Sequence, residues 1–268
     1  MLLLGLAGLA LGAGLHAQPL QPSASGEIKT IVDRGQLIVA MPAFDSPPFF
    51  FERNGTLMGL DVELARRIAA ALGVEARFRR SGKTFNDAVQ SLLDKQADLA
   101  LCKLSLTLIR AKAVRFSDPY LTLHHALALN RERFAAMARG RTVEEVLRDY
   151  TGTLGVIAGS SYVGYAQRKF PKAAIVEYPG WPEVVAAVKN GTVTAAYRDE
   201  FEIKRLPAKD PKISLTVRTV TLKDTRDALA IAVRPEDTQL LYFVNLMLSD
   251  PLELLTTDLI FKNFADWL

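Results

Sequence analysis

The sequence predicts an α/β protein built as two lobes, and two observations lead to this prediction. Over residues 36–105, short apolar runs alternate with amphipathic runs in the order strand, helix, strand, helix, strand. Such an order implies parallel strands joined by right-handed crossovers. The pattern then stops and starts again at residue 151. Two α/β units within 268 residues suit two lobes of ordinary size.

The first unit begins with the apolar run QLIVAM, which is typical of a buried parallel strand. Leucine, isoleucine and alanine then recur at helical spacing, with Asp61 as the expected helix cap and Gly73 as the residue that ends the helix. The predicted elements of this unit are a strand at 36–41, a helix at 60–74, a strand at 75–80, a helix at 84–96 and a strand at 97–105.

The second unit repeats the alternation, and Ser160 or Ser161 is expected to open its first helix. Its predicted elements are a strand at 151–159, a helix at 160–170, a strand at 173–179, a helix at 181–191 and a strand at 193–199. A strand and a helix follow over 228–250, and residues 251–268 are expected to form a closing helix. Ser105 and Asp199 end one strand in each unit, where open α/β sheets bind ligands.

Composition and charge narrow the classes of function. The chain carries 33 basic and 29 acidic residues, for a net charge of +4, and the two signs are interspersed. This excludes a nucleic-acid-binding protein and is compatible with an anionic ligand. The single cysteine, Cys102, permits no intramolecular disulfide and is expected to be a buried small hydrophobe. With three histidines and one cysteine there is no metal-ligand spacing, so we expect neither a metal nor a cofactor.

The first seventeen residues, MLLLGLAGLALGAGLHA, are apolar and uncharged. They are shorter than the roughly 20 residues that span a bilayer as a helix. We therefore expect residues 1–17 to be a signal peptide and 18–26 a linker, with a buried first helix as the alternative. Because no cysteine lies there, the exported protein would carry no lipid anchor, and the periplasm is its expected location.

Several segments, taken in order, resemble one family. They are PPFFFERNGTLMGLDVELARRIAAALGV, FNDAVQSLLDKQADLAL, LSLTLIRAKAVRFSDPY, GVIAGSSY and LAIAVRPEDTQLL. Together they resemble the polar amino-acid branch of bacterial extracellular solute-binding proteins, family 3, which deliver ligands to ABC importers. The resemblance implies the periplasmic-binding-protein type II fold, with two hinge crossings near 123–126 and 223–226. Lobe 1 would then comprise 27–124 plus 223–268, and lobe 2 would comprise 125–222.

The same resemblance implies a ligand-binding site. Arg110 would hold the ligand's carboxylate with help from the Ser105 hydroxyl, since a guanidinium pairs with a carboxylate through two parallel hydrogen bonds. Asp199 would take an α-ammonium group. Ser160 and Ser161 would contribute from lobe 2, and Phe85 would pack against the ligand. The alternatives are a surface salt bridge for Arg110, helix caps for Asp199, Ser105 and Thr107, and core packing for Phe85.

Two positions depart from the family pattern. Ser46 stands where an aromatic residue is usual, so we expect the nearby Phe44 to form that wall of the site. Lys103 stands where the family usually has a small residue. Its ammonium either pairs with Asp199 in place of the ligand's own amine, or binds a second, acidic group of the ligand with Arg79, Arg80 or Lys83 at the rim. The third possibility is that Lys103 reaches solvent.

The sequence therefore predicts a monomeric periplasmic solute-binding protein. It would capture a small carboxylate by hinge closure and deliver it to the membrane subunits of an ABC importer. The expected ligand is an amino acid, with an acidic one preferred, or a related organic acid. Two alternatives stay open. One is a lyase similar to cyclohexadienyl dehydratases, with Glu202 as the general acid three residues after Asp199. The other is a freestanding ligand sensor.

Overall fold

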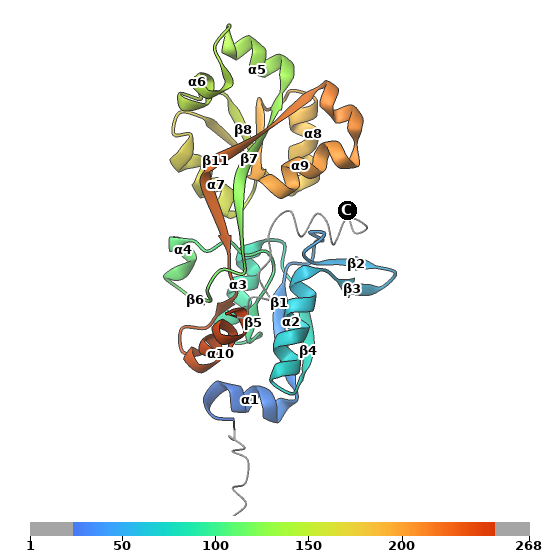
Figure 1. The fold of residues 1–268 in the computed structure, drawn as a ribbon, viewed down its shortest axis with the longest axis vertical. Coiled ribbons are helices and arrows are strands. Elements are labelled where there is room, and N and C mark those ends of the chain that lie inside the picture. Colours follow the sequence, from blue (N-terminus) through green and yellow to red (C-terminus); the bar gives the residue numbers. More distant parts are fainter. Residues whose placement is uncertain (1–23, 250–268) are drawn as a thin grey trace, which may run out of the picture.

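Two α/β lobes lie end to end along the long axis of the molecule (Figure 1). The computed structural model describes residues 24–249. Each lobe has a five-stranded sheet at its centre, with strand orders β4-β1-β5-β12-β6 and β11-β7-β10-β8-β9. Both sheets are mixed, since each combines parallel and antiparallel neighbours. The α/β class with two helix-flanked sheets, as predicted from the sequence, is confirmed.

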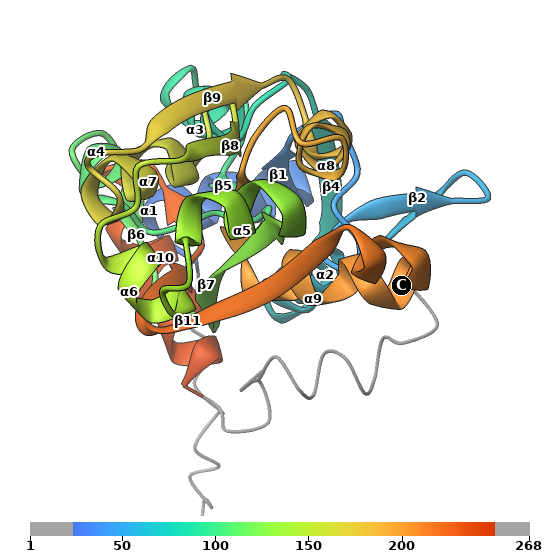
Figure 2. The ribbon, with the colours of Figure 1, turned by 90° about the horizontal axis from the view of Figure 1, so that it is seen from above.

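The first lobe is built on β1, which pairs in parallel with both β4 and β5. Its strands are β1 (Gln36–Met41), β2 (Phe51–Arg53), β3 (Thr56–Met58), β4 (Glu75–Arg80), β5 (Leu99–Ala100), β6 (Arg115–Phe116) and β12 (Ala232–Val233). Its helices are α1 (Gly26–Arg34), α2 (Leu60–Ala71), α3 (Phe85–Leu93), α4 (Leu108–Ala111) and α10 (Thr238–Leu248). β2 and β3 form a hairpin that projects from the side of the lobe (Figure 2).

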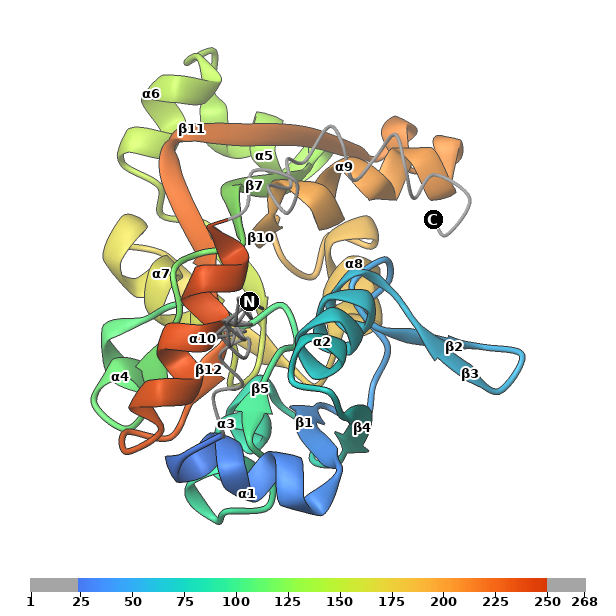
Figure 3. The same cartoon turned by 60° about the horizontal axis from the view of Figure 1, so that its bottom comes forward.

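The N-terminal and C-terminal parts of the described chain lie together in this lobe. α1 and α10 are neighbours (Figure 3), and Glu27 accepts hydrogen bonds from the backbone N–H groups of Gln239 and Leu240. Those two amides belong to the first turn of α10, where no intrahelical acceptor is available. The carboxylate of Glu27 therefore caps α10 from a distant part of the sequence.

The second lobe repeats the plan with β8, which pairs in parallel with β9 and β10. Its strands are β7 (Leu121–Asn130), β8 (Thr153–Ile157), β9 (Ala174–Tyr178), β10 (Ala195–Asp199) and β11 (Val217–Leu229). Its helices are α5 (Arg131–Ala138), α6 (Val143–Arg148), α7 (Ser161–Lys169), α8 (Trp181–Lys189), α9 (Glu200–Lys209) and the 3₁₀-helix η1 (Pro211–Leu215).

Two long antiparallel strands, β7 and β11, run from one lobe to the other (Figure 1). Their pairing register shifts between Leu222 and Asp227. This irregularity lies where the crossing at 223–226 is expected. The lobe boundaries and the hinge role of these crossings stay a prediction, which a second conformation of the protein would test.

Most of the predicted helices and strands are observed close to their expected spans, and two predictions were wrong in detail. The strand expected at 97–105 ends at Ala100, because the chain turns at Lys103, whose φ of 54° lies in the left-handed region. Asp61 does not cap α2. The cap position is Gly59, and Asp61 is buried inside the first turn. Its carboxylate instead accepts hydrogen bonds from Lys103 N, at 2.5 Å, and from Tyr120 Oη, at 3.0 Å.

The proposed signal peptide, most of the linker and the predicted helix at 251–268 lie outside the described residues. Gly26, at the end of the expected linker, already belongs to α1. Within 24–249, no helix has both the length and the apolar character that crossing a bilayer requires.

Candidate ligand-binding cleft

The predicted site residues come together where the two lobes touch. A small cavity there has a volume of about 20 Å³, enough for about one water molecule. Among the residues that line it are seven of the eight predicted from the sequence: Phe85, Lys103, Ser105, Arg110, Ser160, Ser161 and Asp199. Phe44, the eighth, lines a neighbouring cavity instead.

Arg110 is a buried cation held by neutral partners. Thr107 caps the short helix α4, because its side chain accepts from Arg110 N, and the guanidinium then turns inward. Its Nη1 donates to Ser105 O at 2.9 Å and its Nε to Asn86 Oδ1 at 3.0 Å. No carboxylate of the described residues lies within 4.0 Å, so the alternative of a salt bridge is wrong there. Burial lowers the pKa of Arg110.

A guanidinium in this position favours an anionic ligand. Taking a charge out of water is costly unless an opposite charge compensates it. Arg110 is only 6% exposed, and its hydrogen-bond partners are a carbonyl and an amide oxygen. The charge of Asp227, which lines the same cavity without direct contact, opposes the effect of burial only in part. A ligand carboxylate beside Arg110 would supply the missing charge with the bidentate geometry that guanidinium groups prefer.

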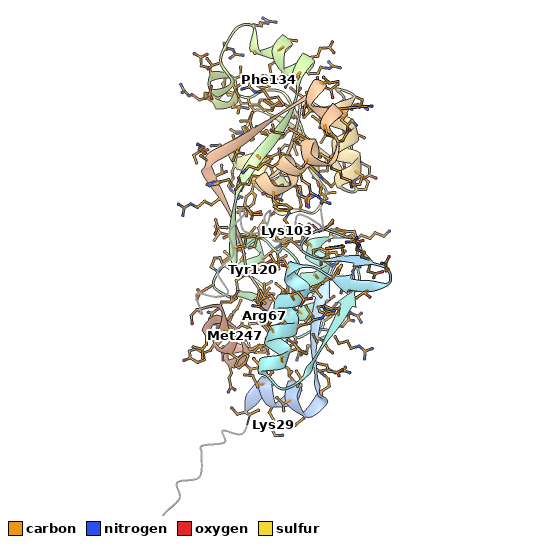
Figure 4. All side chains as sticks on the ribbon, turned by 45° about the vertical axis from the view of Figure 1, so that its right-hand side comes forward. Lys29, Arg67, Lys103, Tyr120, Phe134 and Met247 are labelled. Carbon is orange, nitrogen blue, oxygen red and sulfur yellow. The ribbon has the colours of Figure 1, made fainter. Side chains whose placement is uncertain are left out.

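Lys103 lines the same small cavity as Arg110. It lies where the two lobes meet (Figure 4), and its side chain is only 4% exposed, so the alternative of a solvent-directed lysine is wrong. Its ammonium is 2.9 Å from Asp199 Oδ2 and 3.3 Å from Glu202 Oε1. The same ammonium lies 4.5 Å from the centre of the Phe49 ring, a cation–π contact. Lys103 therefore joins lobe 1 to two carboxylates of lobe 2.

Asp199 performs two tasks at once. Its Oδ1 accepts from Glu202 N at 3.0 Å and so caps α9, as the helix-cap alternative predicted. Its Oδ2 meanwhile pairs with Lys103. Burial by itself would raise the pKa of Asp199, but the charges of Lys103 and Arg198 hold this pKa below its ordinary value. The aspartate expected to take a ligand's ammonium already has an ammonium partner.

Glu202, the general acid of the lyase alternative, is buried. Its side chain is 4% exposed and lies 3.3 Å from the Lys103 ammonium. Two guanidinium groups, those of Arg198 and Arg205, each approach it to 3.7 Å. Lys103, Asp199 and Glu202 thus form one buried ionic cluster with these two arginines.

The serines close the cleft between the two lobes. Ser105 Oγ and Ser161 Oγ share a hydrogen bond of 2.8 Å, which links the loop after β5 to the start of α7. Ser160 is the N-cap residue of α7, but its hydroxyl donates to Ile157 O and not to the helix. The hydroxyls expected to bind a ligand therefore bind one another or nearby backbone.

The two predicted aromatic residues pack against each other. Phe85 is the first residue of α3, and its ring centre lies 5.3 Å from that of Phe44 in an edge-on arrangement. Phe85 is buried and also belongs to the hydrophobic core, as its core-packing alternative predicted. Arg79 and Arg80, considered as rim residues, bind elsewhere: Arg79 to Gln96, and Arg80 to Asp45 and Glu52.

Sequence reasoning missed a buried polar cluster formed by residues of β7, β11 and α7. Asp227 of β11 accepts hydrogen bonds from Tyr162 Oη at 3.0 Å and from Tyr165 Oη at 3.2 Å. Burial raises the pKa of Asp227 to about 6, with the nearby charge of Asp199 adding to this and a hydrogen bond from Ser105 opposing it. His125 of β7 stacks on Tyr165 with ring centres 4.6 Å apart. These groups are distant in sequence, so no local pattern signals them.

A second missed residue, Asp61, holds the backbone of Lys103. Burial raises the pKa of Asp61 to about 7, although its hydrogen bonds with Tyr120 and Lys103 N lower it in part. Lys103 has a left-handed backbone, a conformation that costs a non-glycine residue on the order of 1 kcal/mol or more. The hydrogen bond from Lys103 N to Asp61 fixes this turn and aims the lysine side chain across the cleft.

Two lobes joined by paired strands, with charged groups of both lobes gathered at the junction, form an architecture that is typical of proteins that close around small ligands. The comparison with known families agrees. Residues 37–262 match the family described as bacterial extracellular solute-binding proteins, family 3, and the chain belongs to that family.

The relatives include amino-acid-binding proteins and enzymes. The chain is 27% identical to an arginine-binding periplasmic protein of Mannheimia haemolytica over 61% of this chain, but only about 62% of that protein's length is spanned. It is 26% identical to the L-cystine-binding protein TcyJ of Escherichia coli K12, over 91% of this chain and 86% of TcyJ. A cyclohexadienyl dehydratase of Pseudomonas aeruginosa is 26% identical over 76% of this chain and 74% of its own.

A solved structure supports the fold. The ancestral amino-acid-binding protein AncCDT-1, described as a precursor of cyclohexadienyl dehydratase, superposes with a TM-score of 0.71 at 26% identity. The match covers 90% of this chain and 99% of the ancestral one.

Proposed function

We propose that this protein is a periplasmic solute-binding protein that captures a small carboxylate without an α-amino group and delivers it to an ABC importer. The observation that carries the proposal is the ion pair between Lys103 and Asp199. An amino acid would bring its own ammonium to Asp199, where the lysine ammonium already lies. Two ammonium groups beside one buried aspartate repel each other, which disfavours amino acids.

The carboxylate end of the ligand belongs with Arg110. This cation is buried, has no carboxylate partner among the described residues, and lines the same cavity as Lys103. Ser105 and Ser161 would exchange their mutual hydrogen bond for hydrogen bonds to the ligand when it enters. The ligand therefore interacts chiefly with Arg110 and with hydroxyl donors.

The proposed mechanism is closure that depends on the ligand. The cavity has room for about one water when the lobes touch as they do here, so a ligand must enter while they are apart. A ligand that contacts both lobes binds the closed form more tightly and shifts the population toward it. The importer would then distinguish the closed form from the open one.

Matched pairs of ligands test the proposal. Pyruvate and alanine differ only at the α-carbon, as do 2-oxoglutarate and glutamate, so thermal shifts across such pairs isolate the effect of the amine. A ligand that binds only the folded state raises the melting temperature. We expect an oxo acid to raise it more than its amino acid does, and Arg110→Met to abolish the rise. Larger shifts with the amino acids would refute the proposal.

Lyase activity is a second candidate, favoured by one observation. Glu202, three residues after Asp199, is buried next to Lys103 rather than solvated. A buried carboxylate beside a lysine could take part in proton transfer, and one relative is a cyclohexadienyl dehydratase. The test is to incubate the protein with prephenate or arogenate and follow the product. Turnover that Glu202→Gln removes would favour the lyase, whereas saturable binding without turnover would favour transport.

A further inference from the structure

A buried carboxylate without an ion-pair partner, that of Asp227, lines the same small cavity as Arg110. The volume of this cavity is about 20 Å³, so two groups that line it lie close to anything that enters. Asp227 is only 2% exposed, and no cation of the described residues lies within 4.0 Å of its carboxylate. Burying a charge without a partner is costly, so the ionised form of this group is under strain.

Hydroxyl groups supply the hydrogen bonds of Asp227. Tyr162 Oη donates to its Oδ2 at 3.0 Å, and Tyr165 Oη donates to its Oδ1 at 3.2 Å. The Ser105 hydroxyl contributes a further hydrogen bond. Both tyrosines belong to α7 of lobe 2, whereas Ser105 belongs to the loop after β5 of lobe 1. These hydrogen bonds favour the ionised form, but they bring no positive charge to it.

The balance of these effects places the titration of Asp227 near neutral pH. Burial raises the pKa of Asp227 to about 6, against 3.8 for an ordinary aspartate. The negative charge of Asp199 raises this pKa further, while hydrogen bonds from Ser105 and Tyr162 and the charge of Lys103 lower it in part. A change in the electrostatics of the cavity can therefore change the protonation of Asp227 under ordinary conditions.

The other titratable groups of this cluster keep one protonation state near neutral pH. The titratable and charged groups that surround Asp227 are Tyr162 and Tyr165 of α7, Tyr197 and Asp199 of β10, His125 of β7, Arg110 of α4, and Lys103. Burial raises the pKa of the three phenols, so they stay protonated. Burial lowers the pKa of His125 to about 4, so this imidazole is neutral. Burial alone would raise the pKa of Asp199, but Lys103 and Arg198 hold it below its ordinary value.

A ligand carboxylate at Arg110 would bring a second negative charge into the cavity that Asp227 lines. Ser105, which the proposed function assigns to the ligand, would also turn its hydroxyl from Asp227 to that carboxylate. Both changes disfavour the ionised form of Asp227. A proton on Asp227 removes the repulsion and makes this group a hydrogen-bond donor, whereas the ionised group can only accept.

We propose that Asp227 couples ligand binding to proton uptake: the ligand's carboxylate enters the cavity together with one proton from solvent, and Asp227 takes that proton. The inference rests on the proposed binding of a carboxylate at Arg110, but not on whether the ligand carries an α-amino group. The complex then holds more protons than the free protein does. Binding is therefore tighter at low pH and weakens as the pH rises above about 6.

Calorimetric titration with pyruvate at pH 6, 7 and 8 tests the coupling, since pyruvate stays ionised throughout. Repeating it in buffers of different ionisation enthalpy counts the protons exchanged. We expect uptake of about half a proton or more per ligand at pH 7, and a dissociation constant at least about fivefold higher at pH 8 than at pH 6. Binding without proton uptake and independent of pH would overturn the proposal.

The proton coupling and the proposed function can fail separately. If alanine binds more tightly than pyruvate, the proposed function fails, and the same titration with alanine decides the coupling, because its carboxylate would meet the same Asp227. If neither ligand binds at pH 6, where the coupling favours binding, both proposals fail.

Variants assign the proton to its residue. Asp227→Asn, which keeps the shape of the side chain and an acceptor for the tyrosines, should abolish proton uptake and strengthen pyruvate binding at pH 8 at least about threefold. Tyr165→Phe removes one hydrogen bond to the ionised form and should move the pH profile of binding to higher pH. Its control is Tyr150→Phe, which removes a phenol that donates to Thr153 O and should leave the profile unchanged.

Asp61 is the other buried aspartate that titrates near neutral pH, with a pKa raised by burial to about 7, but it does not line the cavity. Asp61→Asn should therefore retain the proton uptake that Asp227→Asn loses. Proton uptake that persists in Asp227→Asn, or that disappears only in Asp61→Asn, would overturn the assignment to Asp227.

Discussion

Lys103 and Arg110, which both line the small cavity, have opposite kinds of partners. Lys103 meets two carboxylates within 3.3 Å, whereas Arg110 donates to the oxygens of Ser105 and Asn86 and has no carboxylate within 4.0 Å among the described residues. The Asp227 carboxylate acts on Arg110 electrostatically without direct contact and offsets the cost of its burial only in part. A buried cation without a directly paired carboxylate adds little to stability, so it points to binding. Selectivity against an amine would come from the paired lysine.

The largest expected effect comes from removing the paired lysine. Lys103→Met leaves Asp199 and Glu202 buried with only the more distant Arg198 and Arg205 as partners. We expect the free energy of unfolding to fall by about 3 kcal/mol, as for other broken buried pairs. The control is Lys172→Met, which removes the exposed pair with Asp149 and should cost less than about 1 kcal/mol. If urea unfolding shows the same loss of unfolding free energy for both variants, the ion pairs of Lys103 contribute no more to stability than an exposed pair does.

Removing Arg110 should change stability little and ligand binding strongly. Arg110→Met abolishes a costly buried charge and two hydrogen bonds to neutral acceptors, so stability should change by less than about 1.5 kcal/mol in either direction. Carboxylate binding should weaken by about a hundredfold, as expected for the loss of hydrogen bonds to a charged group. Calorimetric titration checks this. A large loss of stability with unchanged binding would assign Arg110 to structure alone.

Because the carboxyl group of Asp61, which accepts from Lys103 N, has a raised pKa, the free energy of unfolding should depend on pH. The pKa of Asp61 is about 7 in the folded protein, against 3.8 for an ordinary aspartate. As the pH rises from about 4 to about 7, the unfolded chain loses this proton first, so the folded state loses stability. The difference in unfolding free energy between wild type and Asp61→Asn should therefore fall across that window, by at most about 1.4 kcal/mol per pH unit.

The comparison of wild type with Asp61→Asn also cancels the effect of His125, whose contribution to the pH dependence of stability has the opposite sign. Burial lowers the pKa of His125 to about 4, so His125 destabilises the folded state as the pH falls from its ordinary 6.5. That histidine is present in both proteins. A difference between wild type and Asp61→Asn that stays constant from pH 4 to pH 7 would show that Asp61 has no raised pKa.

The smallest effect concerns the helix that presents Arg110. Thr107→Ala removes the side-chain cap of α4 and should cost about 1 kcal/mol. Thr142→Ala removes the cap of α6, a helix of the second lobe whose residues do not line the cleft, and should cost a similar amount. Only Thr107→Ala should also weaken carboxylate binding. If both variants bind pyruvate equally well, the cap has no part in positioning Arg110.

The sequence was informative wherever a local pattern determined the structure. The run QLIVAM predicted β1 at its observed bounds, and the hydroxyl of Thr107 predicted the cap of α4. The elements that were not predicted are the strands β2, β3, β6, β7 and β11, the helices α1, α5, α6 and α9, and η1. The converging site residues were predicted through the family resemblance, and their roles remain proposals.

What sequence could not decide depended on contacts between distant segments. Whether Lys103 faces a carboxylate, a ligand or solvent depends on how close lobe 2 comes, and no local pattern encodes that distance. Asp61 has the position of a helix cap in the sequence, yet its burial beneath the turn at Lys103 gives it another task. Asp227 gains its partners Tyr162 and Tyr165 only when β11 and α7 come together.

The central claim is that the Lys103 ammonium takes the place, beside Asp199, that a ligand's ammonium would otherwise occupy. The substitution Lys103→Gly tests this claim. Glycine suits the left-handed backbone at this position, so Lys103→Gly removes the ammonium without straining the turn. The measurement is the ratio of dissociation constants for alanine and pyruvate, in wild type and in Lys103→Gly. We predict that pyruvate binds more tightly to wild type and alanine more tightly to the variant. A ratio that favours alanine in wild type, or that does not change on substitution, would contradict this account.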